Sequence, residues 1–288
     1  LERNKTKRFL FFGDSNIAAT GVKNSDRFTD ILEKILEGIE CYNFGLGGSG
    51  FTEQTLILEE TSKIYKHDVI FFCPHIIDIN RFNQSRIVLD RLTGKIIKRP
   101  RVSFNIKQEK LELVKNFDSS LSYDQKVKQV KKRKGPGLIN KNKLEKIREN
   151  FLIPLIREST LPLFIKEKLL FAKRYKAVYS RWQKNTYESK MVKLILERLI
   201  HNSKNKKIVL CPLPYPKIGN QVNYQPLFRQ AAKEHENVFF IDLDLNLSKL
   251  SREERWSLVF QKDNHYNHKG HKFLALSIKR FLIKEKLL

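Results

Sequence analysis

Cysteine is scarce in this sequence, and long apolar runs are absent from it. The three cysteines among its 288 residues, Cys41, Cys73 and Cys211, cannot form a full set of disulfides, and two of them lie in apolar runs. We therefore expect reduced cysteines that belong to the core. No apolar stretch reaches the roughly 18 residues that a membrane span needs, and no signal-like segment opens the chain. These absences indicate that the chain is soluble as it stands.

Glycine, proline and methionine are also few. With 12 Gly, 9 Pro and 41% hydrophobic residues, the composition excludes a collagen-like or low-complexity chain and supplies a real core. The chain begins at Leu1 and its only methionine is Met191, which suggests that the native start has been removed. A cytoplasmic location is the default expectation, while a location in the cell envelope stays open.

Acidic residues are too few to balance the basic ones. The chain has 56 Lys and Arg against 31 Asp and Glu, a net charge of +25, which favours anionic partners. Residues 91–182 alone contain 25 Lys and Arg and 8 Asp and Glu. Within them we expect an exposed loop at Lys131–Gly137, followed by helical stretches over Leu144–Tyr179. This segment is either a solvated insertion or a docking surface for an anionic glycan or membrane. Nucleic acid is a weaker expectation, because no recognised binding motif accompanies the charge.

Outside this segment, short β-rich runs alternate with runs of helical periodicity. Such alternation is typical of a parallel sheet with helices on both faces. The expected strands are residues 8–12, 41–44, 69–73, 207–211 and 238–241, and the expected helices cover 28–35, 52–65, 190–200, 225–235 and 270–284. One fold is thus split by the basic segment.

Two polar motifs follow the first two strands. Gly13-Asp14-Ser15 places a serine at the ligand-binding edge of such a sheet, although a serine there is also a common helix N-cap. Asn43-Phe44-Gly45-Leu46-Gly47-Gly48-Ser49-Gly50 can turn tightly and aim N–H groups at an anion. This second motif lacks the Lys-Ser/Thr pair of a phosphate-binding loop.

A third motif precedes the last helix, where Asp263 stands two residues before His265. A carboxylate this close can hold one imidazole nitrogen and leave the other free as a general base, which a serine nucleophile requires. A surface histidine is the plainer alternative. His265, His268 and His271 share a spacing that invites a zinc site, but on a helix they would point in different directions, and no cysteine or further carboxylate completes a ligand set.

In this order the three motifs resemble those of the SGNH or GDSL hydrolase superfamily. The resemblance covers about residues 7–82 and 190–281 and excludes the basic segment. It implies one three-layer α/β/α, flavodoxin-like domain over residues 1–288, with a five-stranded parallel sheet and a basic, mainly helical insertion at about 91–182. It also implies that Ser15 is the nucleophile, that His265 and Asp263 complete a triad, and that the N–H groups of Ser15 and Gly48 are oxyanion donors.

The third family motif, Gly-x-Asn-Asp, departs from its usual form. The sequence after the third strand is Cys73-Pro74-His75-Ile76-Ile77-Asp78-Ile79-Asn80, so Ile77 stands where the oxyanion asparagine would be. Either His75 or Asn80 supplies the missing donor, or two backbone N–H groups suffice, or catalysis is impaired. The other motifs are intact, which favours a replacement donor. The spacing Asp-x-His, in place of Asp-x-x-His, resembles a branch that includes glycan O-acetyltransferases.

The expected activity is hydrolysis of a small-molecule or glycan ester, such as an O-acetyl or lipid acyl ester, with no metal or organic cofactor. The alternatives are an O-acyltransferase acting on a glycan and a non-catalytic binding module of the same fold. Phosphoester hydrolysis has weak support from the glycine-rich motif. The sequence makes no prediction of the oligomeric state.

Overall fold

A computed structural model describes residues 7–82, 86–89, 96–99, 102–107, 110–115, 179–183, 185–217, 224–261 and 265–288. Within them one five-stranded sheet has the strand order β2-β1-β3-β8-β9, and all of its pairings are parallel. Its strands are β1 (Lys7–Gly13), β2 (Ile39–Gly45), β3 (Val69–Cys73), β8 (Lys207–Leu210) and β9 (Val238–Phe240). The five strands expected from the sequence are all present, with ends shifted by up to two residues.

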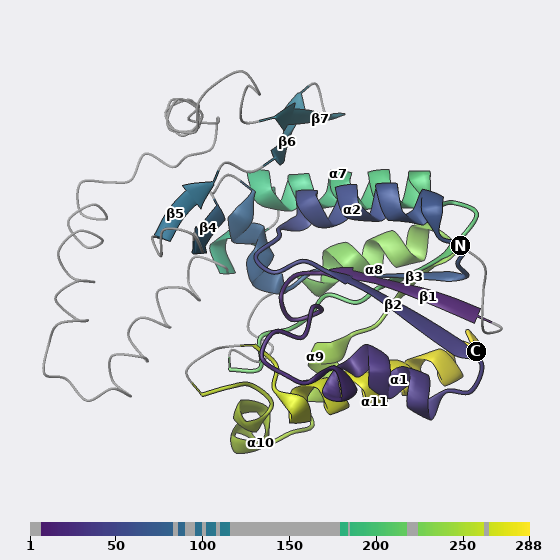
Figure 1. Ribbon diagram of the computed structural model, residues 1–288. Coiled ribbons are helices and arrows are strands. Elements are labelled where there is room, and N and C mark those ends of the chain that lie inside the picture. The colour runs from purple at the N-terminus through teal and green to yellow at the C-terminus, as the bar shows by residue number, and fades with distance from the viewer. Residues whose placement is uncertain are drawn as a thin grey trace, which may run out of the picture.

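Helices cover both faces of this sheet (Figure 1). One face carries α2 (Phe51–Ile64), α7 (Tyr187–Asn202) and α8 (Gln225–Glu234), and the other carries α1 (Phe28–Ile35), α9 (Leu243–Leu247) and α11 (His268–Lys284). The shorter elements are the 3-10 helices η1 (Asn24–Asp26) and η2 (Ile76–Arg81), and α10 (Arg252–Ser257). The three-layer α/β/α fold class is therefore confirmed.

The central strand β1 shows why the sequence folds into three layers. Phe9, Leu10, Phe11 and Phe12 are all fully buried. Successive side chains of a strand point to opposite faces, so Leu10 and Phe12 join the core under α2 and α7, while Phe9 and Phe11 join the core under α1 and α11. A continuous apolar run is thus what a strand buried on both faces requires.

The described part of the predicted insertion differs from the mainly helical expectation. It contains β5 (Ile96–Arg99), which pairs antiparallel with β4 (Arg86–Leu89), and a second antiparallel pair of β6 (Val102–Lys107) and β7 (Lys110–Lys115). The second hairpin packs on α2 and α7, where the N–H of Phe104 donates to Thr52 Oγ1 at 3.4 Å. Apolar and polar residues alternate along β6 and over the first four residues of β7, a period typical of strands. The expected basic loop at 131–137 and most of the expected helical stretches to 179 lie outside the described residues.

The cysteines are as expected in part. Cys73 and Cys211 are buried, Cys41 is half-buried, and all three are free thiols. Cys73 ends β3 and Cys211 directly follows the neighbouring strand β8. Burial raises the pKa of the Cys73 thiol well above its ordinary value. Both therefore serve as small apolar core residues.

Candidate active site

Ser15 and His265 lie in contact although 250 residues separate them. Ser15 comes two residues after the end of β1, at the carboxyl edge of the sheet, and its Oγ lies 2.6 Å from Nε2 of His265. Ser15 is buried, at 8% exposed, and His265 is half-buried. When Nε2 accepts the hydroxyl proton, the imidazole proton resides on Nδ1. This is the arrangement that a serine nucleophile and its general base need.

The loop that carries His265 is fixed to the rest of the site by backbone contacts. The N–H of Phe260 donates to the His265 carbonyl at 3.0 Å, and the N–H of Tyr266 donates to Asn16 Oδ1 at 3.1 Å. Asn267 caps α11, because its Oδ1 accepts from the N–H groups of Lys269 and Gly270. Asn16 directly follows Ser15, and Tyr266 directly follows His265, so the bond between Asn16 and Tyr266 fixes the serine loop relative to the histidine loop.

Asp263, the expected third member of the triad, lies outside the described residues. The structure describes the chain up to Gln261 and again from His265. A role for Asp263 at His265 Nδ1 therefore stays a prediction from the sequence.

The glycine-rich loop after β2 lies beside Ser15. The N–H of Leu46 and the hydroxyl of Ser49 both donate to the Gly13 carbonyl, at 3.0 and 3.2 Å. Gly48 has φ +73°, a conformation that favours glycine. A Cβ built on Gly47 would lie 3.9 Å from the Ser15 Cβ. The loop thus brings its backbone to the nucleophile, as an oxyanion donor at Gly48 would require.

His75 and Asn80 were the two candidates for a third oxyanion donor. His75 is buried beside Tyr215, with the ring centroids 5.8 Å apart, and its Nδ1 accepts from the Ile77 N–H at 3.3 Å. Its proton therefore resides on Nε2, which is shielded from solvent and has no partner among the described residues. Asn80 belongs to η2, but its side chain is outside what the structure describes. Shielding of Nε2 weakens the case for His75, because an ester oxygen could reach it only after a side-chain movement.

The ring of His75 is held neutral. Burial lowers the pKa of His75 to about 4; the charge of Asp14 opposes this shift, and the charges of Arg81 and His265 add to it. At neutral pH the imidazole is therefore an N–H donor without charge.

The sequence did not reveal a largely buried ion cluster that includes Asp14, the residue before Ser15. Arg81 Nη1 lies 2.6 Å from Asp78 Oδ1 and 3.5 Å from Asp14 Oδ2, and it donates to the Ser49 carbonyl. Gln54 Nε2 donates to Asp78 Oδ2 at 2.8 Å. The spacing of Asp78 and Arg81 along η2 was a signal for one of these pairs. Nothing local in the sequence indicated that Asp14 would join them.

The cluster shifts the titration of its members. Burial raises the pKa of Asp78 well above its ordinary value, and the charge of Asp14 raises it further, while Arg81 opposes both. Burial disfavours the charge of Arg81, but Asp78, Asp14 and Glu53 outweigh it, so the pKa of Arg81 is raised. The guanidinium is thus a permanent cation between two carboxylates.

Among the described residues no group of three or more His, Cys, Asp or Glu is placed to hold a metal ion. His271, one of the three histidines with zinc-like spacing, is buried, and its Nδ1 accepts from the Phe28 N–H at 3.4 Å. No described helix is both long and apolar enough to cross a membrane.

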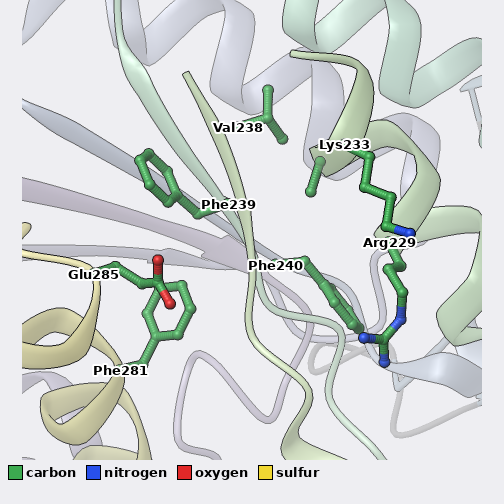
Figure 2. Close-up of a pocket in the computed structure, with 8 residues that line it drawn as sticks. Arg229, Lys233, Val238, Phe239, Phe240, Phe281 and Glu285 are labelled. Atoms are coloured by element: carbon green, nitrogen blue, oxygen red, sulfur yellow. The ribbon is translucent and has the colours of Figure 1, made fainter. Parts of the chain in front are cut away.

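A pocket of about 240 Å³ lies away from Ser15, at the β9 edge of the sheet. Figure 2 shows Arg229 and Lys233 of α8 on one side and Phe281 with Glu285 on the other, with β9 between them. Arg229 is paired with Asp242 at 2.9 Å. None of the residues that line this pocket is one of the predicted site residues.

Comparisons with known proteins give likenesses of structure alone. No family model matches the chain, and no curated protein matches it. A GDSL-family lipolytic protein from Veillonella parvula is similar at 13% identity, over 96% of this chain and 97% of that one, with a TM-score of 0.47. A catalytic mutant of an acetylxylan esterase from Geobacillus stearothermophilus is similar at 15% identity, over 97% and 95%, with a TM-score of 0.49. A lipase/acylhydrolase from Enterococcus faecalis is similar at 15% identity, over 96% and 95%, with a TM-score of 0.45. At these identities and scores the likenesses do not establish the family or the activity of this chain.

Proposed function

We propose that the protein hydrolyses a carboxylic ester, with Ser15 as nucleophile and His265 as general base. The observation that carries this proposal is the 2.6 Å contact between Ser15 Oγ and His265 Nε2 at the carboxyl edge of the sheet. A hydroxyl is a weak nucleophile near neutral pH and becomes a strong one when an imidazole accepts its proton. The glycine-rich loop beside Ser15 adds the backbone N–H groups that acyl transfer needs.

The reaction proceeds through an acyl-enzyme. Ser15 Oγ attacks the ester carbonyl carbon while His265 Nε2 takes the hydroxyl proton. The tetrahedral intermediate then collapses, the C–O bond to the alcohol breaks, and His265 returns its proton to the leaving alcohol. Water attacks the acyl-enzyme with His265 again as base, which releases the acid and restores Ser15. Asp263, by the same proposal, holds Nδ1 and stabilises the imidazolium.

The negative charge of the intermediate is held by the backbone N–H groups of Ser15 and Gly48. Such donors act in a shielded site, where each is worth about 10²–10³ in kcat. His75 and Asn80 remain predictions for a third donor. The hydroxyl of a glycan could replace water as the acceptor with the same groups, so the nature of the acceptor decides between hydrolase and acyltransferase.

Labelling with a fluorophosphonate probe tests the proposal. The wild-type protein is expected to be labelled and to turn over p-nitrophenyl acetate, whereas Ser15→Ala is expected to lose the label and His265→Ala to lower kcat by about 10⁴ or more. Ser189→Ala is the matched control, because Ser189 on α7 is buried to a similar degree, 5% exposed, and should leave labelling unchanged.

The outcomes distinguish a hydrolase, an acyltransferase and a non-catalytic binding module. Equal labelling of wild type and Ser15→Ala would overturn the nucleophile, and an unlabelled, inactive wild type that binds an acylated glycan would favour a binding module. Acetate released into water at the rate of alcohol release identifies a hydrolase. Acetate found on an added sugar acceptor in preference to water would identify a transferase.

A further inference from the structure

Arg81 joins two parts of the proposed site that are separate in the sequence. At the end of η2 its Nη1 contacts the Asp14 and Asp78 carboxylates and the backbone carbonyl of Ser49. The Arg81 side chain is 20% exposed, and those of Asp14 and Asp78 are 1% and 0% exposed. One cation is therefore held among three oxygen acceptors under the site.

Arg81 thus contacts the residue next to each proposed oxyanion donor, Asp14 beside Ser15 and Ser49 beside Gly48. Asp14 directly precedes Ser15, and its carbonyl shares a peptide plane with the Ser15 N–H. Ser49 directly follows Gly48. Among the described residues, Arg81 is the side chain that bonds to both Asp14 and Ser49.

We propose that Arg81 is a positioning residue that fixes the Gly48 N–H relative to the Ser15 N–H, so that both donors meet the oxyanion. This inference rests on the proposed ester hydrolysis. It assigns to Arg81 no contact with the substrate and no proton transfer.

The glycine-rich loop is held by bonds that gather at Ser49. Its hydroxyl donates to the Gly13 carbonyl, and Gln54 Nε2 donates to its Oγ at 3.3 Å and to its carbonyl oxygen at 3.5 Å, the same oxygen that accepts from Arg81. The stem of Arg81 fits against the loop, because a Cβ on Gly50 would lie 2.9 Å from the Arg81 Cβ. All three contacts of Arg81 are made by one nitrogen, Nη1, so a lysine ammonium that reached the same place could replace part of them.

The geometric demand on the loop is strict. Oxyanion donors act at about 2.7–3.1 Å from the developing charge, and a misplacement of about 1 Å can cost about 10² in rate. Loss of the Arg81 contact removes a charged donor from the Ser49 carbonyl, and we expect the loop to shift by a part of that distance although its bonds to Gly13 and Gln54 remain. Arg81 would then affect the step in which the oxyanion forms more than the binding of the ester.

A purely structural role is the alternative. Without the guanidinium, Asp14 and Asp78 would be two buried carboxylates with no counter-ion, which destabilises a fold by itself. The double variant Asp78→Asn with Arg81→Met removes one of these two charges and the repulsion between them, while Asp14 keeps the bonds that its Oδ1 accepts from Asn16. The amide oxygen of Asn can keep the bonds from Gln54 and His75 that Asp78 Oδ2 accepts, but nothing restores the Ser49 contact.

The experiment measures kcat, KM and melting temperature on p-nitrophenyl acetate, together with the rate of fluorophosphonate labelling. Arg81→Met is expected to lower kcat about 10–100-fold with KM changed less than about twofold, and to slow labelling in parallel, because the phosphonyl oxygen uses the same donors. Arg81→Lys is expected to recover part of both rates. The double variant is expected to melt higher than Arg81→Met while kcat stays low.

Arg198→Met is the control. Arg198 forms a two-pronged ion pair with Glu59, at 2.6 and 2.9 Å, that joins α7 to α2, so its loss should lower the melting temperature and leave kcat unchanged. Recovery of kcat together with stability in the double variant would overturn the inference, as would an unchanged kcat in Arg81→Met. An inactive, unlabelled wild type would instead overturn the proposed function on which the inference rests.

Discussion

Gly45 ends β2 where the chain has no room for a side chain. A Cβ at this position would lie 2.1 Å from the Ala18 nitrogen and 2.6 Å from the Ile17 carbonyl carbon. These are backbone atoms of the loop that follows Ser15, so no rotamer change can relieve the overlap. Gly45 is also in register with Gly13 at the end of β1. A methyl group there must push the end of β2 away from the serine loop.

The expected effect of Gly45→Ala is a loss of both stability and rate. Overpacking of this kind costs about 1–3 kcal/mol, and more when backbone must move, which corresponds to about 2–4 °C in melting temperature for each kcal/mol in a domain of this size. The loop of Gly48 begins at Gly45, so its donor would shift relative to Ser15. We therefore expect a melting temperature lower by about 2–12 °C and a kcat lower by about 10-fold or more.

Gly47→Ala is the matched control, measured by thermal melts and p-nitrophenyl acetate turnover under the same conditions. A Cβ on Gly47 would make only an ordinary contact, 3.9 Å from the Ser15 Cβ, so its melting temperature should stay near that of wild type. A Gly45→Ala protein with the stability and kcat of wild type would show that β2 and the serine loop do not meet as described.

Three further predictions concern the third donor, a buried carboxyl and the basic segment. Because His75 Nε2 is shielded, His75→Ala is expected to leave kcat on a small ester unchanged, and Asn80→Ala is expected to lower it if Asn80 is the replacement donor. A gain of about tenfold or more in Ile77→Asn, with both alanine variants silent, would show that no replacement donor exists. Burial raises the pKa of Asp244 to about 7, so the folded state binds this proton more tightly than the unfolded state, and stability falls as pH rises from about 4 to about 7. The melting temperature of Asp244→Asn relative to that of wild type should therefore be higher at about pH 8 than at about pH 5. An equal difference between the two proteins at both pH values would refute this. Neutralising Lys131–Lys134 should weaken binding to anionic vesicles or acidic polysaccharide at low salt, with the difference erased by added salt; binding that ignores salt would contradict it.

The sequence by itself determined the local elements and the identities of the reacting groups. The apolar run from Phe9 to Phe12 predicted a strand buried on both faces, because period and composition are local properties. The position of Ser15 after that strand, and of His265 before the last helix, followed in the same way. The alternation along β6 and β7 was present in the sequence as well, but the basic charge of the segment drew the interpretation towards helices and an exposed loop.

Only the tertiary structure decided which residues meet. The strand order sets the end of β1 between β2 and β3, and the contact of Ser15 with His265 depends on that order and on the packing of α11, across 250 residues of chain. Arg81 shows the same limit, since its spacing from Asp78 is visible in the sequence and its contacts with Asp14 and Ser49 are not. Distance and burial decide which carboxylate pairs with which guanidinium. Distance and burial are properties of the packed chain, because long-range neighbours exist only once the sheet has formed.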